Sequence, residues 1–229
     1  IGRYINRIFL LTTAKKTQLL WVEKELLPWF PAWAELALSL RFSIVLDYDD
    51  AVFHTYDQHQ NQWIALVFRR RIDKLMKNAA LVVVGNEYLA ARARAAGARK
   101  VALIPTSIDL NRYTPSFFDQ SSYRAGNGPL RIVWIGSPST QHYLDVIRRP
   151  LQELAKRHSF ILRLIGAKEF IAPGVQVEFI EWLESTEVES VRLSDVGVMP
   201  LEDSDWERGK CGYKLIQYMA CSLPTVASH

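Results

Sequence analysis

Short runs of apolar residues alternate along the chain with longer segments that carry the 3.6-residue period of an amphipathic helix. This alternation is typical of βα units around a parallel sheet and predicts an α/β protein. Strands are predicted at Leu19–Glu23, Ser43–Asp47, Leu81–Val84, Val101–Ile104, Arg131–Ile135, Ile161–Ile165, Val175–Phe179, Val196–Met199 and Thr225–Ala227. Helices are predicted at about residues 2–14, 30–40, 61–78, 86–96, 139–157, 185–193 and 212–221.

The predicted strands exceed one compact sheet, so we expect two Rossmann-like domains with parallel sheets that face a common cleft. Periodicity lapses at residues 113–129, amid Pro, Ser, Asn and Gly, before a new strand begins. We therefore expect a first domain at residues 1–120 and a second at 128–229. The chain starts at Ile1 rather than Met and stops at His229 directly after an apolar run, so we expect both domains to be cut at their outer ends.

The amino-acid composition argues against several classes of protein. Of the 229 residues, 49% are hydrophobic and 11% aromatic, which is enough apolar surface for a core and argues against intrinsic disorder. The cysteines, Cys211 and Cys221, form no CxxC pattern, so neither a zinc site nor a disulfide framework is expected, and a reducing compartment fits. No apolar run reaches the roughly 18 residues of a membrane-spanning helix. The net charge of +4 favours anionic partners only mildly.

The strongest functional pattern is the segment 209–228. It opens with Gly209 and Gly212, continues as a helix with one apolar face, and stops at Pro224 before a strand. A helix start flanked by glycine offers unpaired backbone N–H groups and the positive end of the helix dipole. Both features favour a bound phosphate group.

Cations gather at the same helix start. Arg208, Lys210 and Lys214 oppose the helix dipole unless an anion binds there, so we interpret them as an anion site, with solvated surface charges as the alternative. Gln217 projects from the second turn, on or near the face of Lys214. From there, an amide side chain could reach the ribose of a nucleotide whose diphosphate lies at the helix start.

This segment resembles the nucleotide-binding region of glycosyltransferase family 4, retaining enzymes of the two-domain GT-B fold that transfer a sugar from a nucleotide-diphosphate donor. The matching positions are Gly212, Met219, Ala220, Pro224 and Val226. Gly209 and Gln217 stand where the family has two glutamates, and Ser222 stands where a helix-ending glycine is expected. A left-handed serine there costs about 1 kcal/mol. The resemblance assigns ribose binding to Gln217.

Other parts of the chain fit the same family. Residues 81–115 look like the last strand and helix of the first domain with the loop that follows, and Asn86 is expected to be a helix N-cap. The segment Trp134–Thr140 follows the first strand of the second domain, where relatives have a glycine turn that faces the donor phosphates. Gly136 and Ser137 are therefore candidate phosphate-binding residues.

Asp47, Asp49 and Asp50 crowd at the end of a predicted buried strand, the edge where open α/β sheets bind ligands. The family to which the chain is similar usually has a His-Asp pair at this strand end. Asp49 stands at the position of the histidine and Asp50 at that of the aspartate. The resemblance therefore makes both residues candidate catalytic residues that bind a donor-sugar hydroxyl or assist transfer. Three alternatives stay open. One is a haloacid-dehalogenase-like phosphatase with Asp47 as nucleophile and Asp49 as acid/base with Mg²⁺. The others are the metal-binding Asp-x-Asp of single-domain glycosyltransferases and a turn with solvated carboxylates.

Two further patterns have simpler interpretations. The basic run Arg69–Arg71 with Lys74 and Lys77 is interpreted as a solvated helix face, with contact to a membrane surface or an acidic acceptor as the alternative. An aromatic stripe is interpreted as core, with part of it in the wall of a groove as the alternative, and consists of Trp21, Trp29, Phe30 and Trp33.

The resemblance implies a retaining glycosyltransferase that moves a sugar from a nucleotide-diphosphate donor to a glycan, lipid or other acceptor. It implies no cofactor, no essential metal and no nucleic-acid partner. The expected location is the cytoplasm, with the inner membrane surface and peripheral membrane contact as alternatives. A non-catalytic nucleotide-sugar-binding module is a further alternative, because both ends of the chain look cut.

Overall fold

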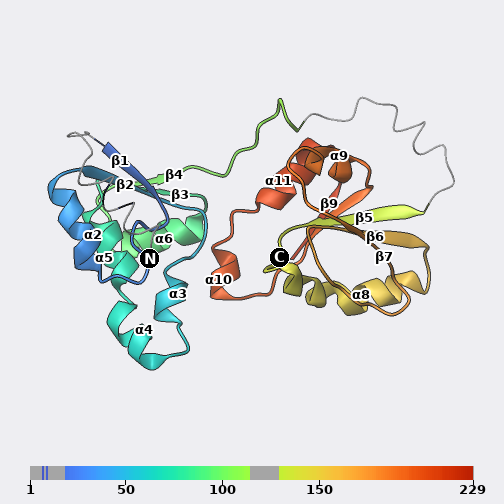
Figure 1. Cartoon of the computed structure of the whole chain (residues 1–229), viewed down its shortest axis with the longest axis horizontal. Helices are drawn as coiled ribbons and strands as arrows, with labels where there is room; N and C mark the ends of the chain where they lie inside the picture. The colour runs from blue at the N-terminus through green and yellow to red at the C-terminus, as the bar shows by residue number, and fades with distance from the viewer. Residues whose placement is uncertain (1–6, 8, 10–18, 114–128, 229) are drawn as a thin grey trace. The chain divides into compact units, whose positions relative to one another are not determined.

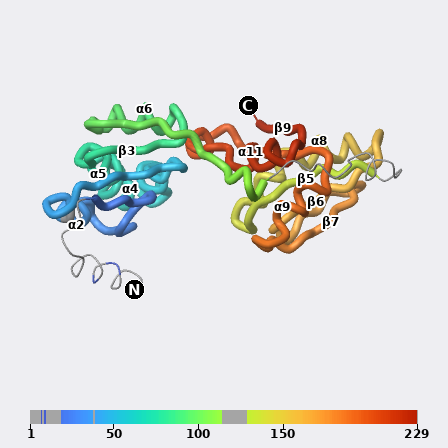
Figure 2. Tube along the Cα trace, turned by 90° about the horizontal axis from the view of Figure 1, so that it is seen from above, coloured from blue at the N-terminus to red at the C-terminus, as the bar shows by residue number. Residues whose placement is uncertain are grey.

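The computed structural model describes residues 7, 9, 19–113 and 129–228. The chain divides into two compact units (Figure 1): Ile1–Thr106 with Ser204–Cys211 form the first, and Ser107–Asp203 with Gly212–His229 form the second. The expected domain break lies mostly at 114–128, outside the described residues. The path of the chain through both units can be followed in Figure 2.

The units differ from the predicted ranges, 1–120 and 128–229, in two places. Tyr113 belongs to the second unit, because its ring is buried in the same apolar cluster as Val133 and Tyr218. Residues 204–211 belong to the first unit, where Gly209 packs so closely on Ala51 that a Cβ added to it would lie 2.4 Å from the Ala51 Cβ.

The first unit has a four-stranded parallel sheet in the order β1-β2-β3-β4. Its strands are β1 (Leu19–Glu23), β2 (Ser43–Tyr48), β3 (Leu81–Val84) and β4 (Val101–Leu103). Its helices are α2 (Ala32–Leu36), η1 (Ala37–Leu40), α3 (His54–Asp57), α4 (Gln62–Phe68), α5 (Arg71–Asn78), α6 (Glu87–Ala95) and α10 (Asp205–Arg208). One apolar core joins alternate strand residues such as Leu46 and Val82 to Met76 of α5 and Leu89 of α6.

The second unit has a five-stranded parallel sheet in the order β7-β6-β5-β8-β9. Its strands are β5 (Leu130–Ile135), β6 (Phe160–Ile165), β7 (Gln176–Ile180), β8 (Val196–Met199) and β9 (Thr225–Ala227). Its helices are η2 (Gln141–Leu144), α8 (Asp145–Ala155), α9 (Glu187–Arg192) and α11 (Tyr213–Ala220).

Helices cover both faces of this second sheet (Figure 1). On one face, Leu151 of α8 packs with Trp134 and Leu162 of the strands. On the other face, Val191 of α9 and Tyr218 of α11 pack with the strands. The strand order reverses at β5, because β6 and β7 extend the sheet to one side of it and β8 and β9 to the other. Open α/β sheets bind ligands at the carboxyl ends of the strands at such a reversal.

The prediction of an α/β fold with two parallel sheets is confirmed, and every predicted strand is present with its ends shifted by at most one residue. The predicted helix at 61–78 is two helices, α4 and α5, because the chain turns at Arg69 and Arg70. The short helices α3 and α10 were not expected, and the helix predicted at 2–14 lies almost wholly outside the described residues. In the described ranges, no helix has both the length and the apolar character that crossing a membrane requires.

The prediction that the aromatic stripe lies in the core is wrong. Trp21 is 54% exposed and Trp33 is 71% exposed, and Trp29 and Phe30 are also exposed. The reason is local: within β1 only Val22 is buried, and α2 turns Ala32 and Glu35 inwards instead of Trp33.

The interpretation of the basic run as a solvated face is wrong for Arg71. Its guanidinium is buried in ion pairs with Glu25 and Glu35 and donates to the carbonyl oxygens of Leu27 at 2.7 Å and Phe30 at 2.6 Å. Burial raises the pKa of Glu25, against the opposing effect of the Arg71 charge. Arg71 thus fixes residues 25–30 to α5, while the other cations of the run are exposed: Arg69, Arg70, Lys74 and Lys77.

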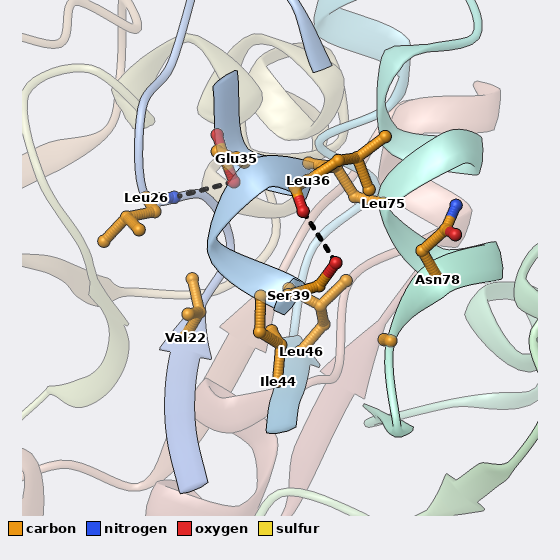
Figure 3. A pocket seen from close by; sticks show the side chains of 10 residues that line it. Val22, Leu26, Glu35, Leu36, Ser39, Ile44, Leu46, Leu75 and Asn78 are labelled. Carbon is orange, nitrogen blue, oxygen red and sulfur yellow. Dashed lines mark hydrogen bonds between the residues drawn. The ribbon is translucent and has the colours of Figure 1, made fainter. Parts of the chain in front are cut away.

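The first unit leaves little internal space near this network. A cavity of about 10 Å³ lies between α2, α5 and the strands β1 and β2, lined by side chains that include Val22, Leu46 and Leu75 (Figure 3). Figure 3 also shows Glu35 accepting from the backbone N–H of Leu26 on its wall. The space holds about one water molecule, so it is not a ligand site.

Ser222, which stands where the family has a helix-ending glycine, is left-handed. Ser222 has φ 60°, and the N–H of Leu223 donates to the carbonyl of Tyr218 at 2.9 Å, which ends α11. A Cβ in this conformation is strained, whereas glycine adopts it freely.

We predict that Ser222→Gly raises the free energy of unfolding by about 1 kcal/mol, because it removes this strain. Urea or thermal denaturation measures the change. Ser159→Gly is the matched control, since Ser159 is also exposed and has no positive φ, and it should be neutral or slightly destabilising. Equal effects of the two substitutions would contradict the assigned conformation.

We predict that Arg71→Leu lowers the free energy of unfolding by about 3–5 kcal/mol, because it leaves the buried Glu35 carboxylate and the partly buried Glu25 carboxylate without their partner. Arg70→Leu, at the exposed neighbouring position, should change it by less than about 0.5 kcal/mol. Chemical denaturation of both variants checks the contrast, and a small loss for Arg71→Leu would show that the residue is solvated after all.

Candidate functional site

A pocket of about 420 Å³ opens in the second unit where the strand order reverses. It lies at the carboxyl ends of β5, β6 and β7 and beside the first turns of α11. Its lining residues are Ile135, Gly136, Ser137, Pro138, Gly166, Trp182, Glu187, Tyr213, Lys214 and Gln217.

The turn after β5 supplies one wall of this pocket. The N–H of Gly136 donates to the carbonyl of Ile165 at 3.0 Å and so continues the sheet pairing. The N–H of Ser137 donates to Thr140 Oγ1 at 3.1 Å, and the Ser137 hydroxyl lies 2.8 Å from that of Ser139. Both backbone donors are therefore engaged. The exposed Ser137 hydroxyl, which shares hydrogen bonds with the hydroxyls of Ser139 and Thr140, is a polar group that this turn presents at the pocket.

Gly166 brings the ends of β5 and β6 together. It follows β6 directly with φ 81°, and a Cβ on it would lie 2.2 Å from the carbonyl oxygen of Gly136. Only glycine fits both the backbone angle and this contact. Sequence analysis missed the residue, although a glycine directly after an apolar strand is the usual sign of a close backbone approach.

The start of α11 supplies the opposite wall. Gly212 has φ 67°, and its carbonyl accepts from the N–H of Leu215 at 2.9 Å, which begins the helix. The space around the Gly212 Cα is open, since an added Cβ would meet nothing nearer than a Leu215 methyl at 3.8 Å. The Lys214 ammonium lies 4.5 Å from the centroid of the buried Trp134 ring, where a cation–π contact holds it.

A buried hydrogen-bond network forms the floor around Gln217. Gln217 Nε2 donates to Glu187 Oε1 at 3.0 Å and to the Tyr113 hydroxyl at 2.8 Å. Glu187 also accepts from the Tyr113 hydroxyl and from Trp182 Nε1, and Arg112 lies 3.6 Å from it. Burial, together with the bond to Glu187, raises the pKa of Tyr113, so its phenol stays protonated and keeps donating.

The other predicted cations belong to the first unit. Arg208 lies 3.5 Å from Asp205, and Lys210 lies 3.6 Å from Asp50. Asn86 caps α6 as expected, because its Oδ1 accepts from the N–H of Leu89 at 2.9 Å. Its Nδ2 donates to the carbonyl of Lys210 at 3.1 Å, which holds the segment 204–211 on this unit.

The aspartate cluster also lies in the first unit, where β2 ends. Asp49 and Asp50 lie 3.0 Å and 3.2 Å from the Lys24 ammonium, and Asp47 accepts from Trp21 Nε1. Burial acts to lower the pKa of Lys24, but the two aspartates outweigh it and the pKa is raised. Lys24 and Lys210 therefore offset the repulsion between the Asp49 and Asp50 carboxylates. In the described residues, no three His, Cys, Asp or Glu side chains are grouped so that they could hold a metal ion.

The predicted site residues thus fall into two groups. Gly136, Ser137, Lys214 and Gln217 line one pocket of the second unit, and Gly212 begins the helix beside it. The first unit carries the remainder: Asp49, Asp50, Arg208 and Lys210. Sequence analysis missed part of the pocket lining, namely Gly166, Trp182, Glu187 and Tyr213.

No known family profile and no curated protein matches the sequence. Solved structures do match its fold. Sucrose-phosphate synthase from Thermosynechococcus elongatus superposes with a TM-score of 0.65 at 14% identity, over 97% of this chain and 58% of that one. A UDP-forming α,α-trehalose-phosphate synthase from Burkholderia xenovorans gives 0.64 at 15% identity, over 99% and 62%. A trehalose-6-phosphate structure from E. coli bound with UDP-2-fluoro glucose gives 0.62 at 11% identity, over 99% and 61%.

The chain therefore has the fold of GT-B glycosyltransferases, and it spans between 58% and 62% of the length of these structures. The predicted fold is confirmed at this level. Membership of family 4 stays a prediction.

We predict that Gly166→Ala destabilises the second unit far more than Gly174→Ala. Both glycines have positive φ, at 81° and 84°, but a Cβ at Gly174 meets nothing within 4 Å. Gly174→Ala should cost about 1–2 kcal/mol from its backbone angle alone. Gly166→Ala should cost at least about 2 kcal/mol more, because two strand ends must separate. Denaturation curves compare the two, and equal costs would mean that the ends of β5 and β6 do not meet as described.

Proposed function

We propose that the chain is the sugar-transferring part of a retaining glycosyltransferase, and that a nucleotide-diphosphate sugar binds in the pocket of the second unit. The observation that carries this proposal is that Gly136, Ser137, Lys214 and Gln217, each predicted separately to bind the donor, line the same pocket. The E. coli structure that matches this fold is one bound with UDP-2-fluoro glucose, which supports a donor of this class.

The diphosphate is proposed to lie at the start of α11. The first N–H groups of that helix and its dipole favour an anion, and Lys214 adds a full positive charge beside them. Negative charge builds up on the diphosphate as the bond to the sugar breaks, so donors fixed at this place stabilise the transition state more than the ground state. The proposal needs no metal to fulfil that role.

The nucleoside is proposed to lie deeper in the pocket. Gln217 has an amide oxygen that can accept from a ribose hydroxyl, and Trp182 and Tyr213 provide aromatic walls against which a base can pack. Asp49 and Asp50 are proposed to assist transfer or bind a sugar hydroxyl, with Lys24 and Lys210 balancing their charge.

The acceptor is proposed to be a glycan, a lipid or another hydroxyl-bearing molecule. Peripheral membrane contact belongs to this proposal, because α4 exposes Trp63, Leu66 and Val67 next to the cations Arg69 and Arg70. Such a pairing of apolar and basic side chains suits an acidic lipid surface.

Release of nucleoside diphosphate from UDP-, GDP- and ADP-sugars tests the function. Turnover of one of them supports the proposal, and binding without turnover would identify a non-catalytic binding module instead. Hydrolysis of a generic phosphoester that is abolished by a chelator and by Asp47→Asn would identify a phosphatase.

We predict that Lys214→Ala weakens the affinity for the nucleoside diphosphate at least about tenfold, because a hydrogen bond to a charged group contributes about 1.5–3 kcal/mol. The stability should fall by only about 0.5–1 kcal/mol, from loss of the contact with Trp134. Calorimetric titration with UDP, GDP and ADP measures the affinity, and a thermal melt measures the stability.

The matched control for this test is Lys156→Ala, which removes an exposed lysine of the same unit whose ion pair, among the described residues, is with Glu153. It should change neither quantity. Unchanged affinity in Lys214→Ala, or a loss of affinity that only follows a loss of folding, would reject the assigned phosphate site.

A further inference from the structure

We propose that Glu187 and Gln217 form an acid–amide pair in which Glu187, with Tyr113, positions the Gln217 amide so that its oxygen accepts hydroxyl groups of the bound nucleotide. The inference rests on the proposed function and adds positioning residues to it. Glu187 is carried by α9 and Gln217 by α11, and both side chains are buried at the floor of the pocket.

The direction of each hydrogen bond in this network is fixed by chemistry. Trp182 Nε1 can only donate, and it donates to Glu187 Oε2 at 2.5 Å. The carboxylate can only accept, so Gln217 must turn its NH₂ group towards it. The Tyr113 hydroxyl donates to Glu187 and accepts from Gln217, which closes a triangle of three groups.

The amide oxygen is the polar atom of the Gln217 side chain that is left for a ligand. Both N–H groups of Gln217 are engaged, and among the described residues Oε1 makes no hydrogen bond and is not a buried unsatisfied atom. Since the residue lines the pocket, this oxygen is the group that a ligand reaches. Glu187 therefore leaves Gln217 with an acceptor, and not a donor, for a ligand in the pocket.

This arrangement also explains why position 217 carries an amide. A second carboxylate there would lie about 3.0 Å from Glu187, inside a buried network. Two carboxylates at that distance cannot both stay ionised without a large penalty. The single negative charge of the pair can stand at either position, provided that the other carries the amide.

Glu187→Gln tests the positioning role. The new amide must turn its oxygen to Trp182 and its NH₂ to Gln217, which then flips and offers donors to the ligand. We expect a roughly three- to tenfold weaker affinity for UDP, GDP or ADP, whichever the unaltered protein binds. We also expect a smaller preference for that nucleotide over its 2′-deoxy and 3′-deoxy analogues, which a merely structural role would not change. Glu189→Gln, which alters an exposed glutamate of the same helix α9, is the control and should match the unaltered protein.

The double variant Glu187→Gln with Gln217→Glu tests the pair as a unit. Trp182 still meets an oxygen, Tyr113 still donates to a carboxylate, and an oxygen again faces the pocket. We expect affinity and deoxy discrimination to return to within about twofold of the unaltered values.

Gln217→Glu alone puts two carboxylates in contact and provides an independent readout. The groups that face the pair are Arg112, Tyr113, Cys221 and, through Tyr113, Tyr213, with Lys214 one turn away on α11. Contact between like charges raises the pKa of the pair in the folded state, so the penalty is absent at low pH and grows as the pH rises above the ordinary value of about 4.3. The melting temperature of this variant should fall below that of the unaltered protein at pH 8 and approach it at pH 5.

The outcomes separate the two proposals. Binding by the unaltered protein, with weakened Glu187→Gln and a rescued double variant, supports the pair. Binding by the unaltered protein with unchanged Glu187→Gln, or with no rescue in a folded double variant, overturns the pair and leaves the proposed function in place. Failure of the folded unaltered protein to bind any of the nucleotides overturns both.

Discussion

The reversal of strand order at β5 is the constraint on which the second unit depends. A parallel sheet is covered by helices on both faces, so its open surface is the edge formed by the strand ends. The chain leaves β5 towards β6 on one side and returns through β8 to α11 on the other. The turns on the two sides diverge, and the pocket of about 420 Å³ lies between them. The local features of the site, including the glycine contact between Gly136 and Gly166 and the position of Lys214, follow from that topology.

Each unit also contains a buried charged side chain that is paired with side chains or backbone groups of the same unit. In the first unit, Arg71 is matched by Glu25, Glu35 and backbone carbonyls, so it fastens a loop to α5. In the second unit, Glu187 accepts from three side chains and holds Gln217 in one orientation. A buried charge is tolerable only when it is paired and hydrogen-bonded, and the same requirement makes both networks rigid. One network supports the fold, and the other prepares the floor of the pocket.

Sequence predicted the sheets well because apolar strands in a parallel sheet are short, continuous and bounded by polar turns, as at Leu81–Val84 and Val196–Met199. Two residues that line the pocket were candidates from the sequence: Lys214 through the cationic helix start, which is a local pattern, and Gly136 through the family resemblance. Glu187 and Trp182 could not be found in this way. The role of Glu187 depends on contacts with Tyr113 and Gln217, which are far away in the chain, and Trp182 takes part through its hydrogen bond to Glu187. Arg71 was misassigned for a similar reason, since its burial depends on Glu25 and Glu35 and not on its basic neighbours.

The most direct measurement for the central claim is a crystal structure of the chain with the nucleoside diphosphate that it binds best. The account predicts that the diphosphate lies at the N-terminus of α11, within hydrogen-bonding distance of Lys214, and that a ribose hydroxyl lies against the amide oxygen of Gln217. A nucleotide bound elsewhere, with the start of α11 unoccupied, would contradict it.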